Sequence, residues 1–331
     1  MIVSVHQAVK LLKDQKLVAI PTETVYGLAG LADSNLAVGQ IYKVKNRPSD
    51  NPLICHFDGL QMLQKYIPAI PDFVQILLQK LTPGPISFLL KIPANSALSP
   101  ATGGRSTVVI RIPNHPIALE IIRQVGKPLA APSANTSGKF SPTSAQMVQD
   151  DIGLKIAGIV DGGQSQIGLE STIVDCTDQN QIRILRQGAV GLAEIDQILA
   201  NLAPKIKILD YSKNQTKQIV PGTKYKHYAP KTPLSEVQNT SQIDLSTPIA
   251  ILGSTQKLSE LKTWLESQPN SSKIELIDLG QNLSQISHNL YQKLFELDQK
   301  NVTKAYLISE DYGQNSLAKA LQDKLERILE K

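Results

Sequence analysis

The sequence has little cysteine and few aromatic residues. Cys55 and Cys176 are its two cysteines in 331 residues, and aromatic residues make up 5%, with Trp264 the single tryptophan. Two cysteines cannot cross-link a fold of this length, and each lies in an apolar run typical of a strand. Cys55 and His56 are neighbours, so on a strand they point to opposite faces and make a poor metal site. We therefore expect two reduced thiols in the core, and no module packed on aromatic side chains.

Long apolar runs are also absent. No run approaches the roughly 20 residues that a transmembrane helix requires. Lys10, Lys13 and Lys16 interrupt the first segment, where a secretory signal would have its apolar core. With 41% hydrophobic and 19% charged residues, the chain has the composition of a globular protein. We expect a cytoplasmic protein with no membrane association and, at about 150 residues per domain, about two domains.

Several common catalytic motifs are missing. The sequence has no Gly-x-x-x-x-Gly-Lys-Ser/Thr loop, no Gly-x-Ser-x-Gly elbow and no His-Glu-x-x-His pair. Carboxylates are sparse beside the motifs described below, with Glu23 and Glu170 the nearest. These absences argue against a common P-loop enzyme, a serine hydrolase of the elbow type and a zinc protease.

The charge is positive but small. Lys and Arg number 34 against 29 Asp and Glu, which gives +5. Residues 1–208 carry 19 basic against 15 acidic residues, residues 209–244 carry 5 against 3, and residues 245–331 carry 10 against 11. The basic first part suits an anionic substrate or partner. An excess of this size does not by itself indicate nucleic-acid binding.

The chain divides into three ranges by pattern. Residues 1–208 alternate short strands and helices with few simple βαβ spacings, which predicts an α/β domain with a mixed sheet. Residues 209–244 are polar and lack an apolar period, so we expect a linker. Its segment PGTKYKHYAP at 221–230 is more distinctive than the sequence of a plain spacer. Residues 245–331 read βαβαβα, which predicts a small Rossmann-like three-layer domain with parallel strands. It has no Gly-x-Gly-x-x-Gly, so we expect it to act in covering or docking rather than in phosphate binding.

Cationic and hydroxyl side chains recur in the first range. PTETVYGL (21–28) ends a strand in a hydroxyl-rich turn, and Lys45 and Arg47 would share one face if their segment is extended. Thr107 and Arg111 lie four apart on an apolar strand, where an arginine needs an anionic partner. The following loop, 131–144, is rich in serine and threonine, which can bind phosphate oxygens. The pattern favours binding of a polyanion over general acid–base chemistry.

The motifs together resemble the threonylcarbamoyl-AMP synthase family, whose catalytic domain is YrdC-like. The resemblance rests on these motifs, in order: PTETVYGL, the Lys-x-Arg of Lys45 and Arg47, NPLICH, the Ser-x-Asn of Ser133 and Asn135, LESTIVD and LRQGA. PGTKYKHYAP followed by a small α/β domain is similar to the long, two-domain form. Asn46 departs from the family, which often has Gly between the Lys and the Arg. The fold implied is a YrdC-like domain with a twisted mixed sheet at 1–208, a linker that covers the active site at 209–244, and a Rossmann-like domain at 245–331.

The resemblance also implies roles for individual residues. Catalytic residues would be Lys45, Arg47, Ser133 and Asn135. Threonine would contact Thr24, His56, Arg111, Ala131 and Ser171. ATP would contact Lys45, Arg47, Asn51, Thr107, Ser133, Asn135, Ser141, Arg186 and Tyr225. Tyr225 belongs to the linker, which would therefore close over the pocket.

The reaction implied joins L-threonine, bicarbonate and ATP into threonylcarbamoyl-AMP and pyrophosphate. This nucleotidyltransferase would supply the group that modifies N6 of adenosine 37 in tRNA, through a downstream transfer machinery. Mg²⁺ would be the cofactor, bound through ATP rather than by protein side chains. Arg111 would hold the threonine carboxylate, because a guanidinium matches it with two hydrogen bonds.

Two other functions remain open from the residues. A basic α/β domain could bind tRNA or double-stranded RNA without catalysis, which predicts steeply salt-dependent binding and no use of ATP. Carbamoyl-transferring enzymes of hydrogenase maturation have a similar central domain. They need cysteine clusters of the zinc-finger kind, and this chain has two cysteines.

Overall fold

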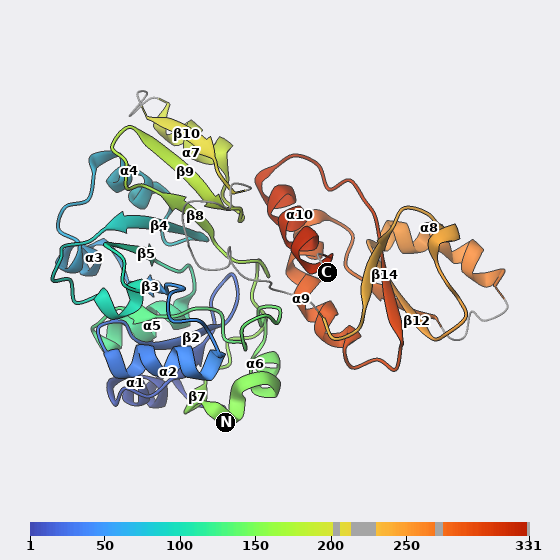
Figure 1. Ribbon diagram of the computed structural model, residues 1–331, viewed down its shortest axis with the longest axis horizontal. Helices are drawn as coiled ribbons and strands as arrows, with labels where there is room; N and C mark the ends of the chain where they lie inside the picture. The colour runs from blue at the N-terminus through green and yellow to red at the C-terminus, as the bar shows by residue number, and fades with distance from the viewer. Residues whose placement is uncertain (201–205, 213–229, 269–273, 330–331) are drawn as a thin grey trace.

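The computed structural model describes residues 1–200, 206–212, 230–268 and 274–329. These residues form a ten-stranded sheet of order β10-β9-β8-β4-β5-β3-β6-β2-β1-β7 and a four-stranded sheet of order β11-β14-β12-β13 (Figure 1). The first sheet and its helices lie on one side of the molecule, and the second sheet lies on the other with α9 and α10 between them (Figure 1).

The elements of the first unit are α1 (Val5–Lys13), β1 (Val18–Ile20), β2 (Gly27–Leu31), α2 (Asn35–Lys45), β3 (Ile54–His56), α3 (Leu60–Tyr66), α4 (Asp72–Leu81), β4 (Ile86–Lys91), β5 (Thr107–Arg111), α5 (Pro116–Val125), β6 (Leu129–Ala130), α6 (Ala145–Ile152), β7 (Gly158–Ile159), β8 (Thr172–Asp175), β9 (Gln181–Arg186), α7 (Leu192–Leu199) and β10 (Lys207–Asp210). The elements of the second unit are β11 (Leu234–Val237), β12 (Ile249–Gly253), α8 (Thr255–Glu266), β13 (Ile274–Asp278), α9 (Leu283–Leu297), β14 (Lys304–Ile308) and α10 (Ser316–Leu329).

The large sheet is mixed, as the irregular spacing of its strands predicts. The pairs β1–β2, β2–β6, β3–β6, β4–β5 and β8–β9 are antiparallel, and the other four pairs are parallel. The small sheet is parallel throughout, as expected for a Rossmann-like unit, and has four strands where the pattern predicts three.

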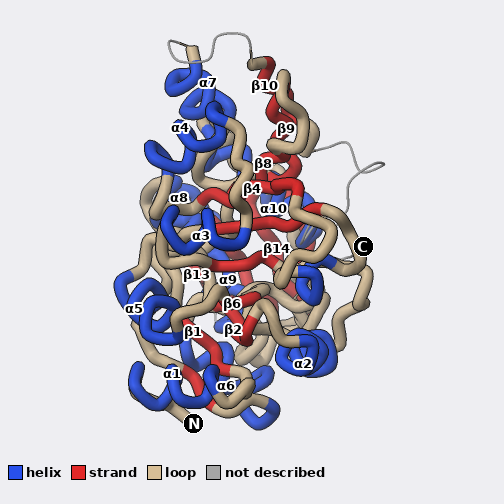
Figure 2. Tube along the Cα trace, turned by 90° about the vertical axis from the view of Figure 1, so that its left-hand side faces the viewer, coloured by secondary structure: helices blue, strands red, loops and turns tan. Residues whose placement is uncertain are grey.

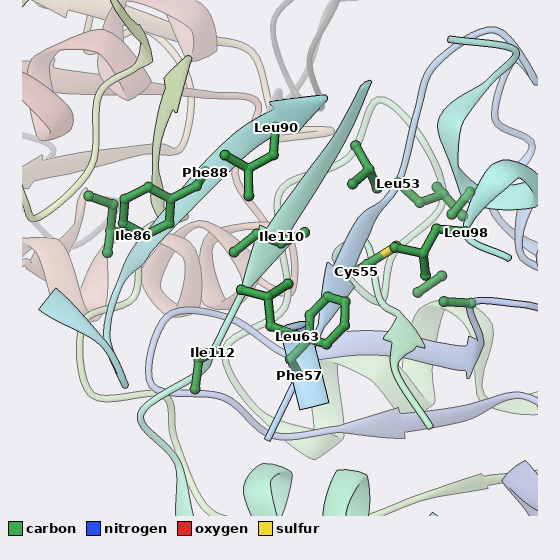
Figure 3. Close-up of a cluster of buried hydrophobic side chains, with 14 of the residues drawn as sticks. Leu53, Cys55, Phe57, Leu63, Ile86, Phe88, Leu90, Leu98, Ile110 and Ile112 are labelled. Atoms are coloured by element: carbon green, nitrogen blue, oxygen red, sulfur yellow. The ribbon is translucent and has the colours of Figure 1, made fainter. Parts of the chain in front are cut away.

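Strand alternation divides the first unit into two cores. On β1, Ala19 packs into the core covered by α2, α3, α4 and α7, while Val18 and Ile20 pack against α1 and α5. The larger core joins Phe57 to the apolar side chains of β4 and β5, among them Phe88 and Ile110 (Figure 3). Cys55 and Cys176 are buried and unpaired, as expected. Helices cover the large core on one face, whereas the other face of β3, β4, β5, β8 and β9 carries a small apolar cluster, which includes no described helix, and the polar motifs.

Helix boundaries follow from side-chain caps. Ser34 begins α2 by accepting a hydrogen bond from the Ala37 amide. The helix ends at Asn46, whose φ of 53° and ψ of 44° are left-handed. Glycine adopts this conformation best and asparagine tolerates it, which explains how Asn46 can stand where the family often has Gly. Lys45 is thus helical, and the expected extended face shared with Arg47 is wrong.

Two strands differ from the expected division of the chain. β10 runs parallel to β9 and crosses the position 208/209, where the composition changes. β11 falls inside the range 209–244, which we expected to be a linker without regular structure, and joins the second sheet beside β14. Val237 is the one buried side chain of β11, so this edge strand has no apolar alternation. Of the linker expected to cover the active site at 209–244, residues 213–229, Tyr225 among them, lie outside the described residues.

The two units share apolar and polar contacts. Val25, Met147 and Leu169 of the first unit belong to a buried cluster made mainly by the second sheet, α9 and α10. His288 on α9 contacts the Gln166 carbonyl, with its Nδ1 3.0 Å from the oxygen. Ser316 at the start of α10 donates to Glu194 at 2.7 Å. Seen from the side, the described chain stacks its strands between helices (Figure 2). Within its described part, no helix is long and apolar enough to cross a membrane.

Candidate active site

A polar pocket opens at the centre of the large sheet, and the space within it and at its open mouth amounts to about 630 Å³. Its floor is a row of polar residues that crosses neighbouring strands. His56 on β3 lies opposite Arg111 on β5, and Arg111 lies opposite Ser87 on β4. The Ser87 and Ser171 hydroxyl oxygens are 2.8 Å apart, and Arg186 on β9 donates from Nη2 to Ser171 Oγ at 3.1 Å. Strand register therefore places two guanidinium groups and an imidazole along one line.

Arg111 is buried and has a carboxylate partner, as the sequence predicts for an arginine in an apolar strand. Its Nη2 lies 2.8 Å from Oε2 of Glu23, and 5% and 3% of the two side chains are exposed. Its Nε also donates to the Gly84 carbonyl at 3.4 Å. Glu23 thus neutralises the charge of Arg111 at the pocket floor.

His56 is neutral at physiological pH. Burial, and then the charge of Arg111, lower its pKa to about 3. Its Nδ1 lies 3.3 Å from the Ile54 carbonyl oxygen, the one partner it has within its own strand. A neutral imidazole beside a cation suits hydrogen bonding to a hydroxyl or an amine of a ligand better than binding of an anion.

The β1–β2 loop forms one wall and is held by its own hydroxyls. Thr22 and Thr24 share a hydrogen bond of 2.9 Å, and Thr22 also donates to the Val25 carbonyl at 2.6 Å. Tyr26 donates to the Gly163 carbonyl at 2.7 Å, which fixes the loop to the segment after β7. The hydroxyl-rich motif PTETVYGL thus organises its own backbone and presents Thr24 to the pocket.

Lys45 supports the opposite wall from outside the pocket. Its ammonium donates to the carbonyls of Ser133 and Asn135, at 2.6 Å each, and 1% of the residue is exposed. Burial, with a smaller contribution from Arg47, lowers its pKa well below the usual value, whereas two carbonyl acceptors favour its charged form. Asn135 lines the pocket, and its Oδ1 is buried without a hydrogen-bond partner in the described chain. That oxygen has the capacity to accept a further hydrogen bond.

Arg47 and Asn51 form a second polar group beside the pocket. Arg47 donates to the Asn51 side chain at 2.6 Å and to the Pro52 carbonyl at 2.9 Å. Thr107 begins β5, the strand that Arg111 ends, so the two residues stand at opposite ends of that strand.

Glu170 lines the pocket and connects it to the second unit. Ser141 donates to Oε1 of Glu170 at 2.6 Å, and Tyr291 on α9 donates to Oε2 at 3.2 Å. Nζ of Lys324 on α10 lies 3.8 Å from the same Oε2. Burial alone would raise the pKa of Glu170, but the charges of Lys324 and Arg186 and the hydrogen bond from Ser141 outweigh it. The pKa is therefore lowered overall, and the group is a carboxylate.

The pocket collects most of the residues that the resemblance singles out. Its lining includes Thr24, Arg47, His56, Arg111, Ala131, Ser133, Asn135, Ser141, Ser171 and Arg186. Lys45 and Asn51 bond to lining residues without lining the pocket themselves, Thr107 is not among the lining residues, and Tyr225 lies outside the described residues.

Sequence reasoning gave no role to several residues that the structure places here. These are Thr22, Glu23, Ser87, Lys139 and Glu170, with Tyr291 and Lys324 behind Glu170. Glu23 and Glu170 were visible as the nearest carboxylates to the motifs. Tyr291 and Lys324 lie more than 60 residues beyond PGTKYKHYAP, the last of the motifs, so local pattern carries no signal for them.

Comparisons with known proteins agree along the whole chain. A family model described as "Telomere recombination" matches residues 10–188, and one described as "Threonylcarbamoyl-AMP synthase, C-terminal domain" matches residues 190–327. A threonylcarbamoyl-AMP synthase of Bacillus subtilis is 44% identical over 232 residues, which are 70% of this chain and 66% of that protein. One of Pyrococcus abyssi is 35% identical over 96% of this chain and 91% of its own length.

A solved structure matches the arrangement of both units. The crystal structure of Pyrococcus abyssi Sua5 complexed with L-threonine superposes with a TM-score of 0.83 at 31% identity, and covers 98% of this chain and 94% of that one. The expected fold, a YrdC-like mixed-sheet domain with a Rossmann-like domain after it, is confirmed. By sequence, domain composition and fold, the chain belongs to the threonylcarbamoyl-AMP synthase family of enzymes.

Proposed function

We propose that the chain is a nucleotidyltransferase that converts L-threonine, bicarbonate and ATP into threonylcarbamoyl-AMP and pyrophosphate. The observation that supports this most strongly is the pocket floor, where Arg111 and Arg186 lie in one row with His56 and Ser171. Such a row offers separate cations for a carboxylate and for phosphates, with hydroxyls and a neutral imidazole between them. The name of the Pyrococcus abyssi structure, a complex with L-threonine, supports a threonine site in this chain as well.

Threonine would lie at the end of the pocket around Arg111. Its carboxylate would accept two hydrogen bonds from the guanidinium, which lies beside Glu23. Neutral His56 and the hydroxyls of Thr24 and Ser171 would contact its polar groups, and Ala131 would pack beside it. The small, mostly buried space at this end suits an amino acid with a short side chain.

ATP would extend along the remaining wall. Arg47 and Arg186 would bind phosphate oxygens, Ser133, Asn135 and Ser141 would line its path, and Asn51 and Thr107 would hold its far end. Lys45 would act through the loop of Ser133 and Asn135, because both of its described hydrogen bonds are to those carbonyls. Tyr225, from the sequence, would complete the contacts.

The chemistry needs two bonds to form. The threonine amine attacks the carbon of carbon dioxide and loses a proton, giving a carbamate; when bicarbonate is the reactant, its hydroxyl leaves with a proton as water. A carbamate oxygen then attacks the α-phosphate of ATP, and the bond to the β-phosphate oxygen breaks to release pyrophosphate. The residues contribute by aligning the reactants and by stabilising charge that develops on the phosphates, since little proton transfer is required.

Mg²⁺ would bind through the nucleotide. Glu170 is the one carboxylate among the described residues that line the pocket, and it already bonds to Ser141 and Tyr291. The other polar lining consists of cations, amides and hydroxyls, a donor set that favours phosphate oxygens over a metal cage. When bound, the ion would neutralise phosphate charge, and Arg47 and Arg186 would hold the phosphates in position.

The product would pass to the machinery that transfers threonylcarbamoyl to adenosine 37 of tRNA, in the cytoplasm. A mixed anhydride hydrolyses readily, so a direct transfer partner is expected. Weak contact with tRNA or double-stranded RNA would be an additional property of the basic first unit, with 19 basic against 15 acidic residues in 1–208.

Pyrophosphate release from ATP tests the proposal. We expect release that requires threonine and bicarbonate together and that stops when either is omitted. Release that is independent of threonine would contradict it. No release, combined with RNA binding that weakens steeply as salt is raised, would favour the RNA-binding alternative.

A further inference from the structure

The contact between Glu170 and the second unit is more deeply buried than a surface contact between domains. Glu170 is 6% exposed, and Tyr291 and Lys324 are each 0% exposed. Lys324 also lies 2.9 Å from Asp323, so its ammonium stands between two carboxylates. α9 and α10, which carry the two residues, are the helices of the second unit that face the first unit (Figure 1).

Stability alone is a weak explanation for such a group. Apolar residues of similar size commonly replace a buried ion pair without loss of stability, and sometimes with a gain. The surrounding cluster, with Leu290, Leu294, Leu321 and Leu325, would readily accept a leucine or methionine. A fully buried lysine and tyrosine hydroxyl that converge on one pocket carboxylate therefore point to a role in the pocket.

The role follows from the proton of Ser141. A serine hydroxyl has one hydrogen to donate and two lone pairs that accept. The Ser141 hydrogen is directed to Oε1 of Glu170 at 2.6 Å, and an ionised carboxylate can only accept. Ser141 therefore faces the pocket as an acceptor. The sequence-based expectation that this serine-rich loop donates to phosphate oxygens is reversed at this position.

We infer that Tyr291 and Lys324 are positioning residues which hold Glu170 ionised and thereby make Ser141 an acceptor for a hydrogen-bond donor of the nucleotide. The inference rests on the proposed use of ATP. The donors that ATP offers are its two ribose hydroxyls and its exocyclic amine. The second unit thus sets the polarity of one contact inside a pocket that the first unit builds.

The test compares nucleotide binding to the full chain by calorimetry. The probes are ATP, 2′-deoxy-ATP, 3′-deoxy-ATP and purine riboside triphosphate, each of which lacks one donor or none. We expect one of the three analogues to bind about tenfold more weakly than ATP, the scale of one lost hydrogen bond. In Ser141→Ala the ratio of the dissociation constant of that analogue to the dissociation constant of ATP should fall to about 1.

The positioning residues are tested by the same ratio. Tyr291→Phe removes a single oxygen. It should reduce the ratio of the two dissociation constants, that of the sensitive analogue over that of ATP, at least threefold, and Lys324→Met should do the same. In the Ser141→Ala background neither change should alter the ratio further, because all act through one hydroxyl. Tyr306→Phe and Lys319→Met are matched controls from the second unit, since Tyr306 bonds to the Asp244 amide and Lys319 is exposed. Both should keep the wild-type ratio.

A purely structural role gives different results. It would lower the melting temperature and weaken all four nucleotides equally, which would overturn the inference. Equal binding of all four nucleotides by the wild-type chain would overturn it too. Tyr291→Phe decides the matter if Lys324→Met does not fold. Pyrophosphate release by the wild-type chain is measured separately, so failure of the inference is distinguished from failure of the proposed function.

Discussion

The Glu23 carboxylate lies 2.8 Å from Nη2 of Arg111, at the floor of a pocket proposed to bind an amino acid. Both Glu23 oxygens and that Nη2 lack a hydrogen bond of good geometry to any described residue. The pair is therefore held by charge while its hydrogen-bonding capacity is not fully used. A ligand carboxylate would meet an arginine that is already neutralised, so the shape of the guanidinium fork matters more than its net charge.

Arg111→Lys should weaken threonine binding by about 1–3 kcal/mol, the scale of a hydrogen bond to a charged group. A lysine keeps the positive charge and loses the two-pronged geometry. Calorimetric titration with threonine measures the loss, and ATP affinity should change less. Arg183→Lys is the matched control, because Arg183 pairs with Asp175 at 2.9 Å away from the pocket. Unchanged threonine affinity in Arg111→Lys would remove Arg111 from the threonine site.

Lys45→Met should lower both stability and activity. The change leaves the Ser133 and Asn135 carbonyls without their lysine donor, and a buried unsatisfied polar group costs about 1–3 kcal/mol. Urea unfolding and pyrophosphate release measure the two effects. Lys43→Met, on the exposed side of the same helix, should leave both close to wild type. If Lys45→Met were as stable as Lys43→Met, the loop of Ser133 and Asn135 would not depend on Lys45.

Stability should depend on pH through His56. Its pKa is about 3 in the folded chain, because of burial and then Arg111, against 6.5 when it is exposed. Between these values the unfolded chain binds a proton that the folded chain does not. The contribution of His56 to stability is therefore complete above pH 6.5 and decreases as the pH falls toward 3.

Melting temperatures between pH 4 and 7 measure this dependence. His56→Asn should lose less stability than wild type as the pH falls through that range. His6→Asn, on the exposed side of α1, is the control and should follow the wild-type curve. Parallel curves for wild type and His56→Asn would show that His56 is not buried as a neutral imidazole.

Two glycines should respond oppositely to alanine. A Cβ on Gly188, in the LRQGA motif, would collide with the Thr172 backbone nitrogen, so Gly188→Ala should separate β8 from β9 and displace Arg186. We expect a large loss of stability and activity. Gly39, inside α2, has no neighbour near its Cβ, and Gly39→Ala should stabilise the chain by about 1 kcal/mol. Urea unfolding compares the two; a tolerated Gly188→Ala would contradict the close packing of the two strands.

Much of the fold was predictable because its elements are amphipathic or buried runs. The helix at 72–81 and the strands at 86–91 and 107–111 fall where the apolar spacing places them. β2, with the sequence GLAGL, was not predicted, since its two glycines weaken the strand pattern. The reason for a glycine at 30 is steric: a Cβ there would lie 2.9 Å from the Leu17 side chain.

The site residues that belong to sequence motifs were predictable. Residues that reach the site from distant parts of the sequence were not. Arg111 needed an anionic partner, and the structure supplies Glu23, 88 positions earlier in the sequence. Lys45 was expected to share one face with Arg47 on an extended segment, but it ends α2 and is followed by the left-handed turn at Asn46. Tyr291 and Lys324 reach Glu170 only because α9 and α10 dock on the first unit, which no local pattern shows.

The place of β11 at the edge of the second sheet has a practical consequence for the design of truncated fragments. β11 comes first in this part of the chain but pairs with β14, the last strand, whose residues Ala305–Ile308 are all buried. A fragment that starts at 245 would lack β11 and leave β14 with an open row of backbone donors and acceptors beside apolar side chains. Such an edge promotes self-association. A fragment that starts before Leu234 keeps β11, which pairs with β14 and so covers the edge that promotes aggregation.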